Sequence, residues 1–171
     1  MESFTLEEQR IILNHLTLGD NFSDKILLYL VSGIRPNEVK HIKEIKQSDN
    51  DYFMHVQGTK TANADRWIKI SKTIAEHFKA KPESFFNFDT QNLRERFKIE
   101  LEQWGIKYGT LYMLRHTFAT NLYYLQVPDK ARQMYMGHYS SKITNDVYTS
   151  FDPTIKPIDI KSLYKELYPE F

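Results

Sequence analysis

The sequence predicts a mainly α-helical domain with one small antiparallel β-sheet, an α+β fold. Apolar residues recur at helical spacing over most of the chain. Strand-forming residues gather only between Asp51 and Ile70, where part of the chain alternates apolar with polar residues. Strands and helices do not alternate along the sequence as a parallel sheet would require. A length of 171 residues fits a single domain, so we assign residues 1–171 to one unit.

Capping and turn residues predict where the helices of the first part begin and end. Thr5 and Glu8 form a capping-box pattern, which places a helix start at about residue 6. Gly33 suits the end of a second helix, and Pro36 suits the first turn of a third, short helix. The three predicted helices span about residues 6–17, 23–32 and 37–42.

A β-hairpin is predicted next, because the period of the pattern changes. Residues 51–57 read DYFMHVQ and are rich in strand formers, and Ile68 and Ile70 share one face of residues 66–70. The polar loop GTKTANAD joins these two segments.

The helical period returns after the hairpin and continues to the C-terminus. Pro128 can start a helix that Gly137 ends. The other helices are predicted by three apolar stripes: Leu93, Phe97, Leu101 and Trp104; Leu114, Phe118, Leu122 and Leu125; and Ile160, Leu163, Tyr164 and Leu167.

Composition excludes several classes of protein. The chain has no cysteine, so disulfides, thiolate metal sites and cysteine catalysis are all excluded, and a reducing cytoplasm is the expected location. Its six histidines form no metal-ligand cluster, and we expect neither metal nor cofactor. There is no signal peptide and no apolar run long enough to span a membrane. A net charge of +1 means that any polyanion must be bound by local placement of basic residues.

An ordered set of polar residues carries the chemical signal. The set comprises Arg35 in SGIRPNEV, Lys60 in GTKT, Arg115 in LRHTFAT, His138 in MGH and Tyr148 in NDVYTS. Two guanidinium groups suit the charge that develops on phosphate oxygens, because they stay protonated and present forked donors. Each residue also has an ordinary interpretation, such as a surface Arg35 paired with Glu38, an exposed hairpin lysine or a helix-capping His138.

These motifs, in this order, resemble the catalytic domain of the tyrosine recombinases, the phage-integrase family. The resemblance covers the chain from TLEEQR to NDVYTS. It implies a site-specific DNA recombinase, or integrase, that cuts and rejoins strands through a covalent 3′-phosphotyrosyl intermediate. It also implies that an N-terminal core-DNA-binding domain is absent from this chain, and that the source is a phage or another mobile element, or a chromosomal system.

The same resemblance implies a role for each residue of the set. Tyr148 is the nucleophile, Arg35 and Arg115 bind the scissile phosphate, Lys60 is the general acid, and His138 donates to the phosphate or positions Tyr148. Glu38 supports a neighbouring arginine. Lys69 and Lys72 are nearby competitors of Lys60 but do not match the family pattern, and His116 is interpreted as structural.

Tyr112 departs from the family pattern, which usually has a histidine three residues before the second arginine. A neutral phenol is a poor base near neutral pH, although it can donate a hydrogen bond to a phosphate. We therefore include Tyr112 among the catalytic candidates and keep an alternative, a DNA-binding module of an integrase-like protein with weak or no catalysis. A third interpretation, a generic helical interaction domain, conflicts with the order of the motifs.

Double-stranded DNA is the expected partner, bound by basic residues collected on one face. The resemblance implies a homo-oligomer on DNA, a tetramer in synapsis, with accessory DNA-bending proteins, in the bacterial cytoplasm next to the nucleoid. The isolated domain can be a monomer, and residues 152–171 can dock on their own domain or on a neighbouring protomer. Further DNA-binding candidates are Lys40, Lys43, Arg66, Lys72, Arg132 and Lys142.

Overall fold

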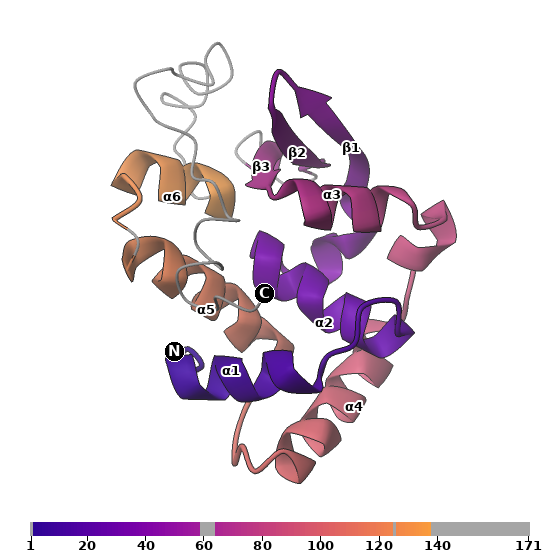
Figure 1. Cartoon of the computed structure of the whole chain (residues 1–171), viewed down its shortest axis with the longest axis vertical. Helices are drawn as coiled ribbons and strands as arrows, with labels where there is room; N and C mark the ends of the chain where they lie inside the picture. Colours follow the sequence, from indigo (N-terminus) through magenta and orange to yellow (C-terminus); the bar gives the residue numbers. More distant parts are fainter. Residues whose placement is uncertain (1, 59–63, 125, 138–171) are drawn as a thin grey trace.

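Most of the chain folds as helices gathered around α2, with a small sheet at one end (Figure 1). The structure is a computed structural model, and it describes residues 2–58, 64–124 and 126–137. The predicted class, mainly α with one small antiparallel sheet, is confirmed. The predicted tail helix, the polar loop around Lys60 and the segment from His138 onward lie outside the described residues.

The first two helices begin at side chains that accept backbone hydrogen bonds. In α1 (Leu6–His15) the predicted capping box is present: Thr5 Oγ1 accepts from the Glu8 N–H at 3.1 Å, and Glu8 accepts from the Thr5 N–H at 3.2 Å. Helix α2 (Asn21–Ser32) begins two residues earlier than predicted, because Asp20 accepts from the Ser23 N–H at 2.9 Å and caps it.

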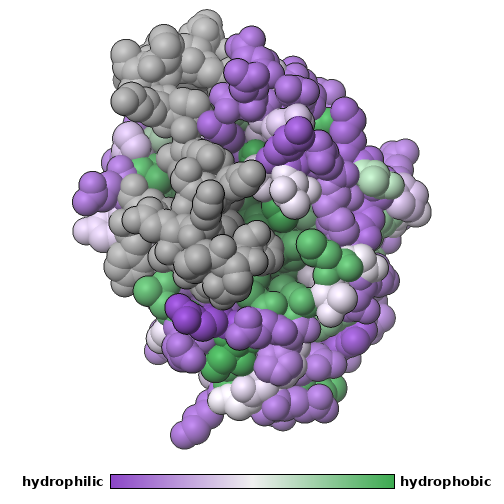
Figure 2. Space-filling model, viewed as in Figure 1, coloured by the Kyte–Doolittle hydropathy of each residue, from purple (hydrophilic) through white to green (hydrophobic). Residues whose placement is uncertain are grey.

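The sheet has three strands, one more than predicted. A 3₁₀ helix, η1 (Pro36–His41), replaces the predicted short helix and leads directly into strand β1 (Ile42–Ser48). β1 pairs antiparallel with β2 (Asp51–Val56), which pairs antiparallel with β3 (Arg66–Ile70). β1 is an edge strand and is mostly exposed, and Figure 2 shows hydrophilic residues over this end of the molecule.

The remaining helices lie beside the sheet and α2 (Figure 1). Helix α3 (Lys72–Lys79), which was not predicted from the sequence, packs on β1 and β2, and the short η3 (Glu83–Phe86) follows it. Most of each predicted apolar stripe is buried, on α4 (Thr90–Gln103) and on α5 (Leu111–Tyr124). Trp104 is only partly buried and follows α4, and Leu125 lies outside the described residues. Helix α6 (Asp129–Met136) ends at the predicted Gly137, whose backbone is left-handed.

Helices α2 and α5 form the centre of the core. Ten of the twelve residues of α2 are buried, so this helix has almost no solvent face. α5 packs along it, while α6 contacts both α5 and β3. The C-terminal ends of α2 and α6 meet the first half of α5 and the start of β3. Among the described residues no helix is long and apolar enough to cross a bilayer.

Candidate active site

The loop that carries Arg35 is held against α5 by Gly33. Gly33 ends α2 with φ +66°, a left-handed conformation that glycine adopts without strain. A Cβ at this position would lie 2.2 Å from Cδ1 of Phe118, so the close approach of α2 to α5 also requires glycine. The next turn is fixed by the buried Tyr29, whose hydroxyl donates to the Pro36 carbonyl at 2.8 Å.

Arg115 lies at the centre of the convergence point. Its guanidinium is 2% exposed and donates to the Gly33 carbonyl at 2.7 Å and to the Met136 carbonyl at 2.6 Å. These bonds join the ends of α2 and α6 to α5, so three of the sequence motifs meet at one side chain. Burial, with the nearby positive charges of Arg35 and Arg66, lowers the pKa of Arg115 to about 10, so it remains protonated at neutral pH.

Glu38 is the negative group of the cluster and has two arginine neighbours. It accepts from the backbone N–H of Arg35 at 2.7 Å, and its carboxylate lies 3.6 Å from Nη1 of Arg35. Arg66 donates to both of its oxygens, at 2.7 and 3.0 Å. Burial raises the pKa of Glu38, but the hydrogen bonds and charges of Arg66 and Arg35 outweigh this and bring the pKa below its ordinary value.

Arg66, predicted as a DNA-binding residue, is buried in the structure and does not lie on an exposed face. It is 2% exposed, and it also donates to the carbonyls of Tyr135 and Ala64, at 2.8 Å each. The burial of Arg66 could have been predicted from the alternation of side chains along β3. Arg66 shares a face of the strand with Ile68 and Ile70, and this face points into the core.

Tyr112 lies on α5 one turn before Arg115, and its side chain reaches solvent. It is 37% exposed, and its ring lies 5.2 Å from that of His116. Burial, with the positive charge of Arg115, lowers the pKa of His116, so its imidazole is neutral at pH 7. Its Nε2 atom is buried without a hydrogen-bond partner in the described part of the chain.

The other predicted basic residues have different surroundings. Lys40, Lys43 and Lys72 are exposed, and Lys72 lies 3.9 Å from Glu76 on α3. Arg132 pairs with Asp129 at 3.0 Å on α6. Lys60, His138, Lys142 and Tyr148 fall outside the described residues.

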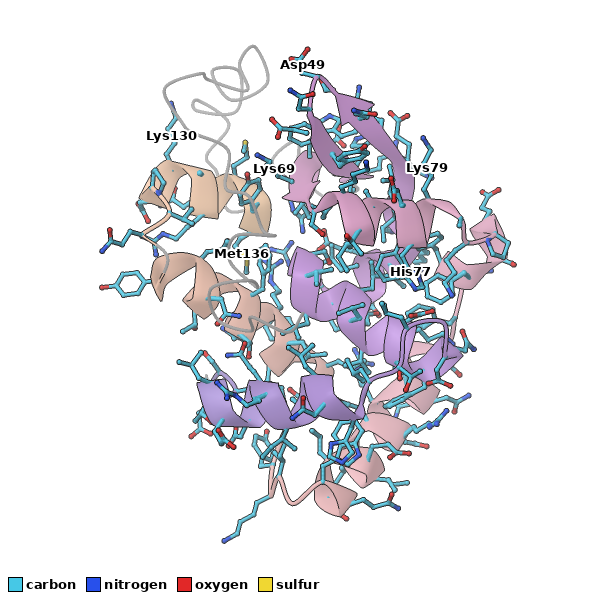
Figure 3. The ribbon with its side chains drawn as sticks, in the orientation of Figure 1. Asp49, Lys69, His77, Lys79, Lys130 and Met136 are labelled. Carbon is cyan, nitrogen blue, oxygen red and sulfur yellow. The ribbon has the colours of Figure 1, made fainter. Side chains whose placement is uncertain are left out.

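Two further features were not predicted from the sequence. Lys69 of β3 is 6% exposed and pairs with Asp51 at 3.0 Å, and Figure 3 shows its strand beside the end of α6 at Met136. A groove of about 740 Å³ between β1, α3 and η3 is lined in part by Lys40, Lys43 and Lys79. Of the predicted catalytic residues that the structure describes, Arg35, Tyr112 and Arg115 do not line this groove. In the described part of the chain no group of three His, Cys, Asp or Glu residues could hold a metal ion.

Comparison with known families gives a match over most of the chain. The model described as the phage integrase family matches residues 6–154. The chain belongs to the phage integrase family. The family assignment includes the segments that contain Arg35, Arg115 and Tyr148.

Two curated relatives are similar in sequence to this integrase-family chain. A tyrosine recombinase XerA of Pyrococcus horikoshii is 28% identical over 165 residues, which cover 86% of the chain and 56% of that protein. A tyrosine recombinase XerC-like protein of Caldanaerobacter subterraneus subsp. tengcongensis is 33% identical over 75 residues, covering 44% of the chain and 19% of that protein. The matched region therefore spans at most a little over half of the length of either relative.

Two solved structures share the fold of the integrase-family chain. A crystal structure of XerA recombinase has a TM-score of 0.65 and 16% identity, covering 100% of this chain and 65% of that one. A structure of the XerH site-specific recombinase bound to palindromic difH substrate, a post-cleavage complex, has a TM-score of 0.61 and 18% identity, covering 89% of this chain and 50% of that one. These similarities support the observed arrangement of helices around a small sheet.

Proposed function

We propose that this chain is the DNA-cleaving and rejoining domain of a site-specific recombinase that acts through a 3′-phosphotyrosyl intermediate on Tyr148. The observation that carries the proposal is the charge balance where the motifs converge. The positive charges of Arg35, Arg66 and Arg115 surround the carboxylate of Glu38. An excess of fixed positive charge at low solvent exposure is suited to the developing charge of a phosphoryl-transfer transition state.

The proposed reaction exchanges one phosphoester bond for another. The Tyr148 oxygen attacks the scissile phosphorus, and its proton leaves to solvent or to a base. The bond from phosphorus to the 5′ oxygen breaks, and that oxygen takes a proton from Lys60. Arg35 and Arg115 stabilise the charge on the non-bridging oxygens, and His138 donates to the phosphate or positions Tyr148. Rejoining is the reverse of this step, so no oxidant or nucleotide is consumed.

Tyr112 is proposed to act as a hydrogen-bond donor. It lies on the same face of α5 as Arg115 and is partly exposed, which suits contact with a bound phosphate. The ring of His116 lies beside it, 5.2 Å away between centroids, and Nε2 of that imidazole has no hydrogen-bond partner in the described part of the chain. Membership of the phage integrase family is the reason to prefer the catalytic interpretation to a binding module without chemistry.

Duplex DNA is the proposed substrate, bound through phosphate contacts along one face. Lys40 and Lys43 line a groove and are exposed, so they suit phosphate contacts better than Arg66 does. Lys72, Arg132 and Lys142 remain candidates for the same face. Assembly as a homo-oligomer on DNA, help from DNA-bending proteins and a place in the bacterial cytoplasm belong to the same proposal.

Covalent capture tests the proposal. The chain is incubated with a pool of DNA duplexes that contain a random-sequence segment. One strand of each duplex carries a nick within this segment and a label at its 5′ end. A cut close to the nick releases a short fragment, so rejoining is prevented. Labelled DNA that stays attached to protein in denaturing gels is then sequenced. We expect an adduct that disappears in Tyr148→Phe and persists in the matched control Tyr164→Phe. The proposal would be overturned if Tyr148→Phe formed as much adduct as the unchanged chain. It would also be overturned if neither the unchanged chain nor the full-length protein formed any adduct.

A further inference from the structure

The two oxygens of Glu38 are divided unequally between its arginine neighbours. Oε1 accepts from the Arg35 backbone N–H at 2.7 Å and from Arg66 Nη2 at 3.0 Å. Oε2 accepts from Arg66 Nη1 at 2.7 Å, whereas Arg35 Nη1 lies 3.6 Å away. Glu38 thus binds the backbone of Arg35 closely but its guanidinium only loosely.

The two arginines also differ in burial. Arg66 is 2% exposed, whereas the side chain of Arg35 is 36% exposed. A forked donor on a carboxylate makes two charge-assisted bonds and neutralises most of its charge. The arginine that reaches solvent is therefore the one that Glu38 binds weakly.

We infer that Arg66 is a positioning residue: by occupying the carboxylate of Glu38, it keeps the guanidinium of Arg35 available for a phosphate. The inference rests on the proposed function. It replaces the predicted role of Arg66 as a DNA ligand with a role that needs no contact with DNA.

Arg66 also fixes the backbone on the far side of the site. Its Nε donates to the Tyr135 carbonyl at 2.8 Å, and a Cβ on Gly137 would lie 3.2 Å from its Nη1. Arg66 thereby sets the end of α6 relative to Glu38. Together with the Arg115 bond to the Met136 carbonyl, two buried guanidinium groups hold consecutive residues of this turn.

Removal of Arg66 has a definite consequence for Arg35. In Arg66→Met the buried Glu38 loses its bidentate partner, and an unpaired buried charge is costly. Arg35 is the other described residue that forms an ion pair with Glu38, so its guanidinium moves in to replace the lost partner. A second change, Glu38→Gln, removes the charge that draws Arg35 inward and should release it.

The direct test is nuclear magnetic resonance of the arginine side chains in the full chain, with the Arg35 Nε–H signal assigned from Arg35→Lys. We expect exchange of this proton with water to slow about tenfold in Arg66→Met and to recover in Glu38→Gln/Arg66→Met, as expected for gain and loss of a charge-assisted bond. Unchanged exchange in Arg66→Met would overturn the inference, whether or not the protein cleaves DNA.

If Arg66→Met does not fold, Arg66→Lys serves instead, because it keeps the charge without the fork. We then expect slowing that is smaller but still measurable, since one oxygen of Glu38 becomes open to Arg35. No slowing in Arg66→Lys would equally contradict the inference.

Adduct formation on the nicked duplexes gives the functional arm. We expect Arg66→Met to form adduct at least about tenfold more slowly, and the double variant to regain a measurable part of the rate. The matched control is Lys81→Met, which removes the lysine partner of the buried Asp24 far from the site. If Lys81→Met slows the adduct equally, or the double variant regains nothing, lost stability explains the effect and the inference fails. Absence of adduct in the unchanged chain refutes the proposed function alone, and the exchange measurement still decides the role of Arg66.

Discussion

Replacement of Gly33 by alanine tests how closely α2 must approach α5. The new Cβ would lie 2.2 Å from Cδ1 and 2.8 Å from Cε1 of Phe118, which is buried and cannot turn away freely. The residue also keeps φ +66°, which costs a non-glycine residue about 1–2 kcal/mol. Overpacking of a well-filled core adds about 1–3 kcal/mol. We expect Gly33→Ala to lower the free energy of unfolding by about 2–5 kcal/mol in total.

Two other glycines separate these contributions. Gly19 has φ +95°, and no heavy atom lies within 4 Å of the place that a Cβ would take, so Gly19→Ala carries backbone strain without overlap. Gly109 does not have a left-handed backbone, but its Cβ would lie 2.6 Å from Leu101 and Phe4, so Gly109→Ala carries overlap alone. The measurement is urea unfolding of the four proteins followed by circular dichroism.

The comparison has a clear refuting outcome. If Gly33→Ala loses no more stability than Gly19→Ala, then Phe118 yields without cost and the close approach is not required. For a domain of this size each kcal/mol lowers the melting temperature by about 2–4 °C. Gly33→Ala should therefore melt about 4–20 °C lower than the unchanged chain. Partial recovery in Gly33→Ala/Phe118→Leu would identify the ring as the source of the overlap.

Three further predictions concern separate parts of the molecule. Burial raises the pKa of Asp24, but hydrogen bonds from Lys81, Gly19 and His77 outweigh burial and bring this pKa below its ordinary value. The ionised carboxylate therefore stabilises the fold above the unfolded pKa near 3.8, and this stabilisation is lost as the pH falls through the folded pKa. When the free energy of unfolding is measured at decreasing pH, it should fall less steeply in Asp24→Asn than in the unchanged chain. Asn121→Ala should destabilise by about 1–3 kcal/mol because it leaves the buried amide of Gln9 without its reciprocal partner, and thermal unfolding checks this. Tyr112→His should change the rate of adduct formation by no more than about tenfold if hydrogen bonding suffices, and a much larger gain would mean that the native phenol is a handicap.

Some helix boundaries were predictable from a capping box or from a terminal glycine, although the Asp20 cap of α2 was missed. Thr5 and Glu8 satisfy each other's backbone donors as the pattern requires, and Gly33 and Gly137 end their helices with left-handed conformations. These are local interactions, so the sequence alone contains the information. The same holds for the apolar stripes of α4 and α5, because their period matches the helix.

Edge elements were harder to predict because they bury little. Strand β1 reads IKEIKQS and exposes most of its residues, so it lacks the apolar alternation that reveals a half-buried strand. Helix α3 has eight residues, of which only Ile74, Ala75 and Phe78 are buried, and its pattern is too short to distinguish from a loop. The two elements pack against each other, a contact that local sequence patterns do not specify.

The candidate site was predictable as a set of residues but not as a network. The motifs containing Arg35 and Arg115 were recognised, and their segments do meet through Gly33. The burial of Arg66 was not predicted, because its charge was weighed above its position in the strand. The bidentate bond to Glu38 joins residues 28 positions apart, and no local pattern specifies that pairing.

The hydrogen bonds of Arg115 have a consequence for synthesis of the protein. They reach 82 residues back to Gly33 and 21 residues forward to Met136. Such distant pairings form only after the intervening chain is available. A nascent chain therefore carries Arg35 on the ribosome well before the backbone of residue 136 can complete the site. Assembly of the arginine cluster is in this way delayed until most of the domain has been translated.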